Sequence, residues 1–215
     1  MSFYTVARNC LGGFFRVLYR TQITGKENEP VEGPVLVCAN HLSNHDVIVL
    51  GASLKRPVRF FAKAELFRIP VVAQLVKALG AFPVDRGVAA SSSAALKTTI
   101  SLLEQGEMVG IYPQGTRHIG VDPRNTPVKG GVGMAAYHSK ATILPVLIRT
   151  KSWKMGLFRR TYVTIGKPIP FEELNMTGHR GADFLKASEY IFQKITDMIP
   201  DDIPCPEPAE KTDVH

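Results

Sequence analysis

Cysteines and long apolar runs are both scarce in this 215-residue sequence, and each shortage excludes a class of protein. The three cysteines, Cys10, Cys38 and Cys205, are far apart and form no Cys-x-x-Cys pair, which argues against a disulfide framework and a zinc knuckle. No window of about 18 residues is apolar without interruption, and the N-terminus lacks the cleavage site of a secretory signal. We therefore expect a cytoplasmic protein that neither spans a membrane nor is secreted.

Acidic residues are few outside the C-terminal tail. The net charge is +7, but residues 200–215 carry −4, which leaves +11 for residues 1–199. A basic folded part suits a polyanion, an anionic lipid surface or a phosphorylated substrate, and composition does not choose among these partners. The composition is otherwise ordinary, with 45% hydrophobic and 21% charged residues, so we expect one globular core.

Short β-rich runs alternate with helical stretches along most of the chain. The runs that predict strands are 35–39, 58–62, 81–84, 108–112, 143–148 and 161–165. The stretches that predict helices are 46–54, 71–79, about 93–104, 130–138 and 180–198. This alternation predicts a single α/β domain, with a largely parallel or mixed sheet covered by helices on both faces.

Three regions differ in composition. Residues 1–20 mix aromatic residues with arginines and predict an amphipathic helix, which either lies in a membrane interface or packs on the core. Residues 21–199 hold the alternating pattern and form the expected α/β domain. Residues 200–215 are proline-rich and acidic, so we expect a disordered tail.

A polar stretch, ANHLSNHD, separates the first predicted strand from the first predicted helix. Ser43 or Asn44 can cap that helix, and Asp46 suits its first turn. His41 is not needed for capping. A carboxylate bonded to one imidazole nitrogen fixes the tautomer and leaves the other nitrogen as a general base, so His41 and Asp46 are a candidate dyad. His45 is interpreted as a structural or surface residue.

Cations follow three other elements. Arg86 ends GAFPVDR after a short strand, Arg117 ends YPQGTR after the next strand, and Lys129 precedes two glycines at the start of a helix. In parallel sheets such loops meet at the carboxyl edge, where cations and a helix N-terminus form an anion pocket. A phosphate-bearing ligand is the interpretation we favour over solvated surface charges.

Four ordered blocks resemble the glycerolipid acyltransferases, in the 1-acylglycerol-3-phosphate acyltransferase branch. NHLSNHD matches the family's Asn-His-x-x-x-x-Asp box, and GAFPVDR, YPQGTR and ILPVLI are similar to its later blocks. FFAKAELFRIP is also similar to family sequence, and the match runs over roughly residues 20–170. The resemblance implies a glycerol-3-phosphate acyltransferase-like fold and acyl transfer from a thioester to lysophosphatidic acid, in phospholipid biosynthesis.

The resemblance also implies roles for the candidate residues. His41 would take the proton from the glycerol hydroxyl and Asp46 would orient His41. Arg86 and Arg117 would hold the acceptor phosphate, and Lys129 would join them. No enzyme nucleophile is then needed, which agrees with the absence of a Gly-x-Ser-x-Gly elbow from the sequence.

The rest of the phosphate pocket follows from the same blocks. Gly115 would let the backbone pass close to the substrate and Thr116 would donate a hydroxyl. Gln114 departs from the family, which usually has Glu there, so charge-based support of an arginine is lost. Lys63 and Asn40 are secondary candidates for this pocket. No metal site is predicted.

No resident cofactor is predicted, and the acyl donor is either acyl-CoA or an acyl carrier protein. The basic aromatic stretch 151–160 either enters an anionic membrane surface or forms a solvated hairpin around one packed tryptophan. The expected location is the cytoplasmic face of the inner membrane, as a peripheral protein. We expect no nucleic-acid partner, because no such motif is present.

Three other functions stay open. One is a peripheral lipid-binding homologue with impaired catalysis, motivated by Gln114. A second is acylation of a related lysolipid. A third is thioester hydrolysis by the same dyad with water as the acceptor.

Overall fold

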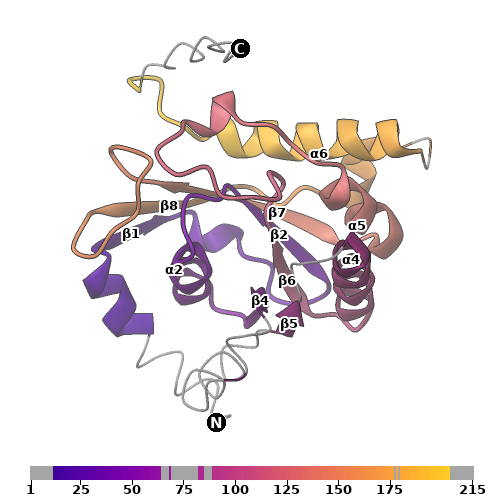
Figure 1. Ribbon diagram of the computed structural model, residues 1–215, viewed down its shortest axis with the longest axis horizontal. Coiled ribbons are helices and arrows are strands. Elements are labelled where there is room, and N and C mark those ends of the chain that lie inside the picture. The colour runs from indigo at the N-terminus through magenta and orange to yellow at the C-terminus, as the bar shows by residue number, and fades with distance from the viewer. Residues whose placement is uncertain are drawn as a thin grey trace.

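The computed structural model of the chain describes residues 12–63, 68, 82–84, 89–176, 178 and 180–203. Its centre is a six-stranded sheet with the strand order β1-β8-β7-β2-β6-β3 (Figure 1). The strands of this sheet are β1 (Thr21–Thr24), β2 (Val35–Ala39), β3 (Val58–Arg59), β6 (Met108–Ile111), β7 (Thr142–Arg149) and β8 (Thr161–Ile165). A separate two-stranded sheet pairs β4 (Phe61–Lys63) with β5 (Phe82–Val84).

Helices lie on both faces of the larger sheet, as the sequence predicts. The α-helices are α2 (Asp46–Ser53), α4 (Ala89–Glu104), α5 (Gly131–Ser139) and α6 (Gly181–Thr196), and short 3-10 turns are η1 (Lys26–Asn28), η3 (Pro123–Asn125) and η4 (Phe171–Leu174). In Figure 1, α6 runs along one face of the sheet and α2 lies against the other. The fold is therefore a mixed α/β domain.

The register of the sheet brings two loops together. β2 is parallel to both β6 and β7, while β7 and β8 are antiparallel, so the sheet is mixed. Cys38 of β2 is level with Ile111 of β6. The chain leaves both strands at the same edge, so the loop that follows β2 lies beside the loop that follows β6.

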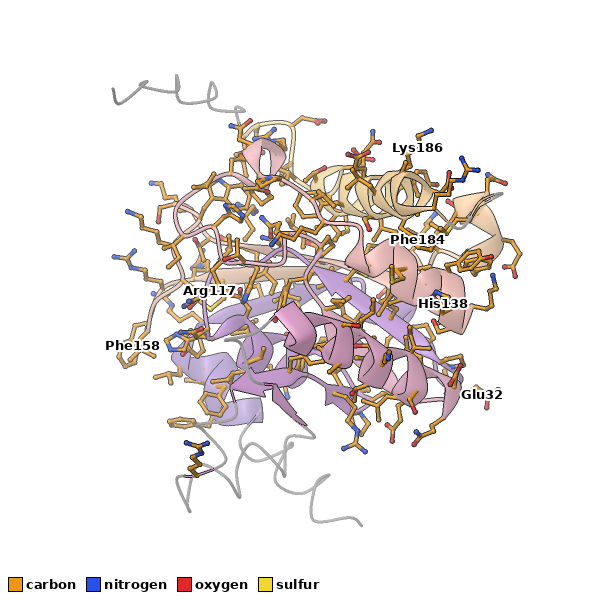
Figure 2. The ribbon with its side chains drawn as sticks, turned by 45° about the vertical axis from the view of Figure 1, so that its right-hand side comes forward. Glu32, Arg117, His138, Phe158, Phe184 and Lys186 are labelled. Carbon is orange, nitrogen blue, oxygen red and sulfur yellow. The ribbon has the colours of Figure 1, made fainter. Side chains whose placement is uncertain are left out.

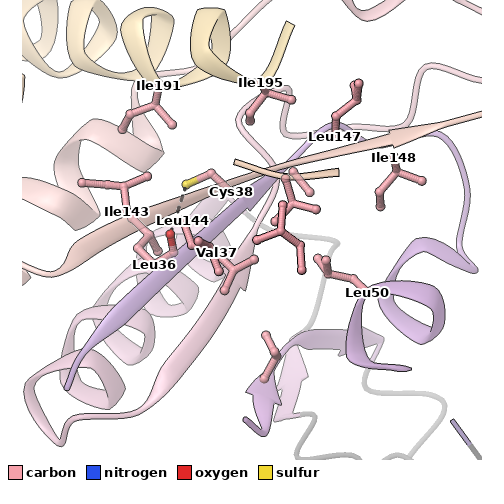
Figure 3. Close-up of a cluster of buried hydrophobic side chains, with 14 of the residues drawn as sticks. Leu36, Val37, Cys38, Leu50, Ile143, Leu144, Leu147, Ile148, Ile191 and Ile195 are labelled. Atoms are coloured by element: carbon pink, nitrogen blue, oxygen red, sulfur yellow. Dashed lines mark hydrogen bonds between the residues drawn. The ribbon is translucent and has the colours of Figure 1, made fainter. Parts of the chain in front are cut away.

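The core is built on β2, all five residues of which are buried. Such a strand has neighbours on both faces, and its continuous apolar run VLVCA follows from that position. Figure 3 shows its side chains between Ile191 and Ile195 of α6 and Leu50 of α2. The buried positions of α6 recur at helical spacing, which turns one apolar stripe toward the sheet: Phe184, Ala187, Ser188, Ile191, Phe192 and Ile195.

Most predicted elements are confirmed, with three differences. β1 was not predicted, because TQIT alternates polar and apolar residues in only four positions at the sheet edge. The run 58–62 is divided between β3 and β4, which belong to different sheets. α4 begins at Ala89 rather than near Ser93. The helix predicted at 71–79 lies outside the described residues.

The ends of the described chain stay close to the domain. Residues 12–18 are helical although they begin with two glycines, and Tyr19 after them is buried. At the other end, the carbonyl of Ile203 accepts a hydrogen bond from Arg124. The division at 20 and 199 stays a prediction. Within the described ranges, no helix has the length and apolar character needed to cross a bilayer.

Cys38 is a free, buried thiol on β2. Its side chain donates to the carbonyl of Leu36, and burial raises the pKa of the thiol far above its usual value. It is a core side chain, since a nucleophilic cysteine needs access and a lowered pKa. Cys10 and Cys205 lie outside the described residues.

Candidate active site

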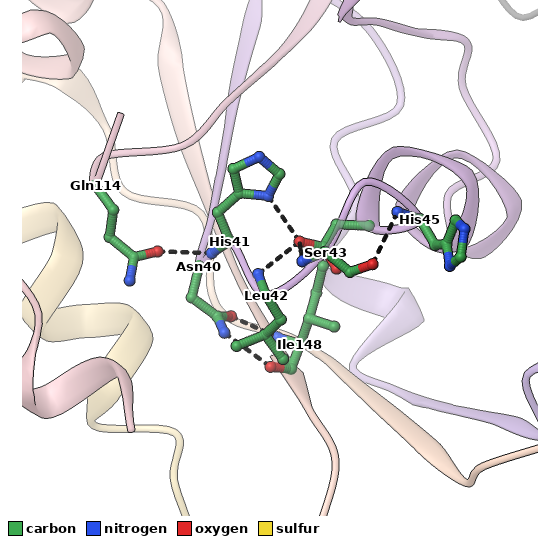
Figure 4. A network of polar contacts seen from close by, with 8 residues as sticks. Asn40, His41, Leu42, Ser43, His45, Gln114 and Ile148 are labelled. Carbon is green, nitrogen blue, oxygen red and sulfur yellow. Dashed lines mark hydrogen bonds and ion pairs between the residues drawn. The ribbon is translucent and has the colours of Figure 1, made fainter. Parts of the chain in front are cut away.

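The loop between β2 and α2 brings His41 and Asp46 into contact. Nδ1 of His41 lies 2.7 Å from Oδ2 of Asp46, and both side chains are buried (Figure 4). A carboxylate only accepts hydrogen bonds, so Nδ1 carries the proton and Nε2 keeps its lone pair. No described residue hydrogen-bonds Nε2. The pair predicted from a spacing of five residues therefore has the geometry of a general base with an orienting carboxylate.

Asp46 also shapes the loop that carries His41. Its Oδ2 accepts the backbone N–H groups of Leu42 at 2.6 Å and Ser43 at 2.8 Å, in addition to the imidazole. The expectation that Ser43 or Asn44 caps α2 is wrong in this respect, since the residue before the helix is His45 and makes no side-chain cap. Ser43 does contribute to the turn, because its hydroxyl accepts the N–H of His45 at 3.2 Å. One carboxylate thus closes the loop and orients the histidine.

The other oxygen of Asp46 has no such partners. Oδ1 is buried and, among the described residues, receives no hydrogen bond. All of the carboxylate's recorded bonds converge on Oδ2, so three donors hold the oxygen that faces the imidazole. This arrangement restrains the rotation of Asp46 and keeps the dyad assembled without a ligand.

Gln114 holds the backbone of His41 from the neighbouring loop. Its Oε1 accepts the N–H of His41 at 2.6 Å, and its Nε2 donates to Oγ1 of Thr126 at 2.7 Å. The hydroxyl of Thr126 donates in turn to the carbonyl of Pro123 at 2.7 Å. Gln114 is fully buried. Its two ends therefore use both properties of an amide, one as an acceptor and one as a donor.

Tyr112 stacks on the imidazole of His41. The ring centroids are 3.9 Å apart and the planes differ by 10°. Burial, followed by the nearby charge of Asp46, raises the pKa of Tyr112 well above its usual value, so the phenol stays neutral. Its hydroxyl is buried and meets no hydrogen-bond partner in the described part of the chain. The ring acts as a flat support that limits rotation of His41.

His118 lies beside the same backbone. Its N–H donates to the carbonyl of His41 at 2.9 Å, which places the residue after Arg117 against the loop between β2 and α2. Burial lowers the pKa of His118, and the charge of His41 lowers it further. His118 is therefore neutral at neutral pH.

Asn40 is a buried side chain that joins the loop to β7. Its side-chain Nδ2 donates to the carbonyl of Ile148 at 2.8 Å, and its Oδ1 accepts the N–H of Ile148 at 2.7 Å. The side chain extends the pairing of β2 with β7 by one step beyond Ala39. Asn40 is fully buried, and both ends of its amide are occupied. These bonds align the loop with β7, and a role of Asn40 in the phosphate pocket stays a prediction.

Comparison with known proteins is consistent with these motifs. A model of the Acyltransferase family matches residues 20–149. The chain is 32% identical over 169 residues to the 1-acyl-sn-glycerol-3-phosphate acyltransferase of Bacillus subtilis, an alignment that covers 77% of this chain and 82% of that protein. This chain belongs to the acyltransferase family. The 1-acyl-sn-glycerol-3-phosphate acyltransferase of Borreliella burgdorferi is 31% identical over 182 residues, covering 84% of this chain and 69% of that protein.

The fold of this acyltransferase has also been seen before. The crystal structure of the 1-acyl-sn-glycerophosphate (LPA) acyltransferase from Thermotoga maritima superposes with a TM-score of 0.66 over 90% of this chain and 77% of that one. The two sequences are 23% identical. The likeness confirms the predicted fold class.

Two of the predicted basic residues of this family member, Arg117 and Lys129, lie at the surface of the connection between β6 and α5. Thr116 and Arg117 are exposed, and Lys129 is exposed at the start of α5. Gly115 has a φ of 67°, and a Cβ there would lie 2.8 Å from the Cδ atom of Lys129. Gly115 therefore makes room for the lysine side chain, and the backbone bond from Lys129 to Pro113 at 2.9 Å joins the two segments.

Two other predicted residues are described only in part or not at all. Arg86 lies outside the described residues. Lys63 is the last residue of β4, where its backbone is level with Val84 of β5. That register places it near the strand that precedes Arg86, and the position of its side chain is not described.

Three contacts of the site were not predicted. Tyr112, Thr126 and His118 reach His41 or Gln114 from positions more than 70 residues after His41 in the chain. For Tyr112 and His118 the available signal is their place on either side of the PQGTR block. Thr126 has no sequence signal, because its contact depends on how the loop before α5 folds back.

Proposed function

We propose that this chain transfers an acyl group from an acyl thioester to the free hydroxyl of a 1-acylglycerol 3-phosphate, forming phosphatidic acid. The observation that carries the proposal is the 2.7 Å contact of His41 with Asp46 at the end of β2. Membership of the acyltransferase family and relatives named 1-acyl-sn-glycerol-3-phosphate acyltransferases support it.

The dyad supplies the proton transfers. Nε2 of His41 accepts the proton of the glycerol hydroxyl while the hydroxyl oxygen forms a bond to the carbonyl carbon of the thioester. The resulting tetrahedral intermediate collapses, the carbon–sulfur bond breaks, and the imidazolium returns its proton to the departing thiolate. Asp46 stabilises the imidazolium while it exists and keeps Nε2 directed at the substrate.

The acceptor phosphate would bind to the cations of the adjacent loop. Arg117 precedes His118, whose N–H donates to the carbonyl of His41, so the backbone of Arg117 lies close to the loop that carries the base. Lys129 lies over Gly115 in the same loop cluster. Arg86 completes the proposed set together with Thr116, which offers a hydroxyl. Fixing the phosphate would position the acceptor hydroxyl for the base.

The donor and the place of action follow from the same proposal. The acyl group would come from acyl-CoA or from an acyl carrier protein, and no resident cofactor or metal takes part. The acceptor is a lipid, so the enzyme would work as a peripheral protein on the anionic, cytoplasmic face of the inner membrane.

A product assay tests the proposal directly. Purified protein is given lysophosphatidic acid and acyl-CoA or acyl carrier protein, and phosphatidic acid and free fatty acid are both measured. Phosphatidic acid as the main product supports acyl transfer. Free fatty acid alone would indicate a thioester hydrolase. The absence of both products would support a lipid-binding homologue with impaired catalysis.

Gln114 does not by itself favour the impaired alternative. Its Nε2 donates to Thr126, and a carboxylate at the same position has no hydrogen to donate. The loop before α5 is therefore built around an amide, and Gln114 supports the backbone of His41 with its other end.

A further inference from the structure

Four exposed apolar side chains come from two segments that are far apart in the sequence. Phe14 and Val17 of the helix at residues 12–18 are 59% and 76% exposed, and Leu157 and Phe158 of the β7–β8 connection are 52% and 69% exposed. These four side chains, together with Arg20, Arg159 and Arg160, are called the two-segment surface below. Exposed apolar side chains gathered at one place mark an interaction site more often than scattered ones do.

A backbone contact fixes the two segments to each other. The N–H of Phe158 donates to the carbonyl of Leu18 at 2.8 Å. Phe158 adopts a left-handed backbone with φ of 61°, an unfavourable conformation for a bulky residue. Its side chain is exposed, so core packing does not compensate for this conformation. Strain of this kind concentrates at functional positions.

The rest of the β7–β8 connection is anchored inside the protein. Trp153 is buried in the core, and its carbonyl accepts the N–H of Gly120 at 2.9 Å. Trp153 is thus the packed tryptophan of one of the two alternatives for the stretch 151–160, because its ring packs within the domain. Leu157 and Phe158, at the tip of the same connection, are exposed.

Positive charge adjoins the apolar residues along both segments. Arg20, Arg159 and Arg160 are exposed, and the stretches 12–20 and 150–160 contain no Asp or Glu. Exposed aromatic and aliphatic side chains flanked by arginines match a bilayer with anionic headgroups, where the apolar groups enter and the cations stay at the phosphates.

The two-segment surface is close to the candidate active site. Tyr19 follows the helix at residues 12–18, and its ring lies 5.6 Å from the ring of His45, the residue before Asp46. Figure 2 shows Phe158 and Arg117 on the same side of the molecule, whereas Glu32, His138 and Lys186 lie on the other. A bilayer on this surface would therefore meet the side that carries the proposed phosphate-binding arginine.

We propose that the two-segment surface docks the protein on an anionic lipid bilayer, with Leu157 and Phe158 among the acyl chains and Arg159 and Arg160 at the headgroups. The proposal rests on the proposed function only in that the acceptor is a membrane lipid. An acidic carrier protein would complement the charge of the arginines. Its acidic surface would not explain why Phe158 is both exposed and held in an unfavourable backbone conformation.

Flotation of the full chain with vesicles tests this docking. The double variant Leu157→Asn, Phe158→Asn removes the apolar tip, and asparagine tolerates the left-handed backbone at 158. We expect it to lose at least about tenfold in binding to vesicles that contain phosphatidylglycerol, since two apolar side chains no longer enter the bilayer. Arg159→Gln, Arg160→Gln should lose the preference for these vesicles over phosphatidylcholine vesicles.

Val31→Asn is the matched control. Val31 is 90% exposed, and its neighbour Glu32 lies on the opposite side of the molecule from Phe158. The Val31→Asn variant should bind the vesicles as well as the unchanged chain does. Equal binding by the double variant would overturn the proposal, as would a loss of self-association or of carrier-protein binding with vesicle binding intact.

A second readout separates this proposal from the proposed function. Turnover is measured with a water-soluble, short-chain acceptor and with the acceptor embedded in vesicles. The double variant should lose turnover only on vesicles. If the unchanged chain acylates neither acceptor, the proposed function fails, while flotation still decides the docking surface.

Discussion

The loop after β2 and the loop after β6 lie side by side, yet the candidate proton-transfer residues of the first and the candidate phosphate-binding residues of the second differ in burial. In the first loop, Asn40, His41 and Asp46 are buried and hydrogen-bonded within the protein. In the second loop, Thr116 and Arg117 are exposed, and Lys129 is exposed beside them. Neither Arg117 nor Lys129 forms an ion pair with any described residue.

This difference separates two parts of the proposed reaction. A general base must be oriented before the substrate arrives, and buried hydrogen bonds to Asp46 and Gln114 achieve that in the free protein. A phosphate-binding group must instead remain open, because a cation already paired within the protein would have to give up that partner. Burial with internal partners thus marks the proton-transfer part, and exposure without them marks the proposed ligand-binding part.

The largest expected effect is loss of the base. His41→Ala removes the proton acceptor and should lower kcat by about 10²–10⁴, the usual contribution of a general base. Phosphatidic acid formation from saturating lysophosphatidic acid measures it.

His45→Ala is the neighbouring control for that experiment. His45 is exposed, its hydrogen bonds are made by its backbone, and its ring lies near Tyr19 and not in the dyad, so turnover should stay close to that of the unchanged chain. Equal turnover in His41→Ala and His45→Ala would show that the buried dyad is not the proton-transfer part.

The next effect concerns the loop after β6, where Arg117 is exposed. Arg117→Ala should raise KM for lysophosphatidic acid and lower kcat/KM by about 10–100-fold, as expected for the loss of a hydrogen bond to a charged group. Thermal stability should not change, because the side chain is exposed. Initial rates at several acceptor concentrations measure it.

Lys186→Ala is the matched control, since Lys186 is also exposed but lies on the other side of the molecule (Figure 2). Its kinetics should be unchanged. A drop in the melting temperature of Arg117→Ala with KM unaltered would mean that Arg117 serves the fold and not the ligand.

A smaller effect tests the link between the two loops. In Gln114→Glu the carboxylate still accepts the N–H of His41, but it cannot donate to Thr126. We expect a decrease of about 1–3 kcal/mol in the free energy of unfolding and no gain in turnover. Chemical denaturation and the acyl-transfer assay measure the two quantities.

Gln114→Glu with Thr126→Ala provides the comparison. The double variant lacks the hydroxyl of Thr126, to which the carboxylate cannot donate. Its free energy of unfolding should therefore fall by less than the sum of the decreases in the two single variants. A large rise in turnover for Gln114→Glu alone would contradict this account. It would instead favour the homologue with impaired catalysis.

The smallest effect separates the ring of Tyr112 from its hydroxyl. Tyr112→Phe keeps the stack on His41 and removes a buried hydroxyl that has no partner among the described residues, so stability should change by less than about 0.5 kcal/mol. Tyr112→Leu loses the stack and should cost about 0.5–1.5 kcal/mol with reduced kcat. Denaturation and kcat measured on both variants decide between ring and hydroxyl, and equal losses would contradict the stacking role.

Local patterns in the sequence were sufficient for the dyad and for most of the sheet. VLVCA reads as a buried strand because every residue of β2 has neighbours on both faces, and the polar stretch after it could only be a loop. A separation of five residues lets a turn bring His41 to Asp46. These features depend on interactions within about ten residues, so they are visible in the order of residues.

The sequence by itself therefore determined the α/β class and the position of His41 and Asp46 in the loop after a buried strand, while the grouping of the cations stays a prediction. Only the tertiary structure decided that Gln114 holds His41, that Tyr112 stacks on it, that Asn40 joins β7, and that Trp153 is buried while Phe158 is exposed. Each of these contacts joins segments through the register of neighbouring strands or the packing of a distant loop. Side-chain hydrogen bonds and burial depend on distances in space, and those distances exist only once the sheet has formed.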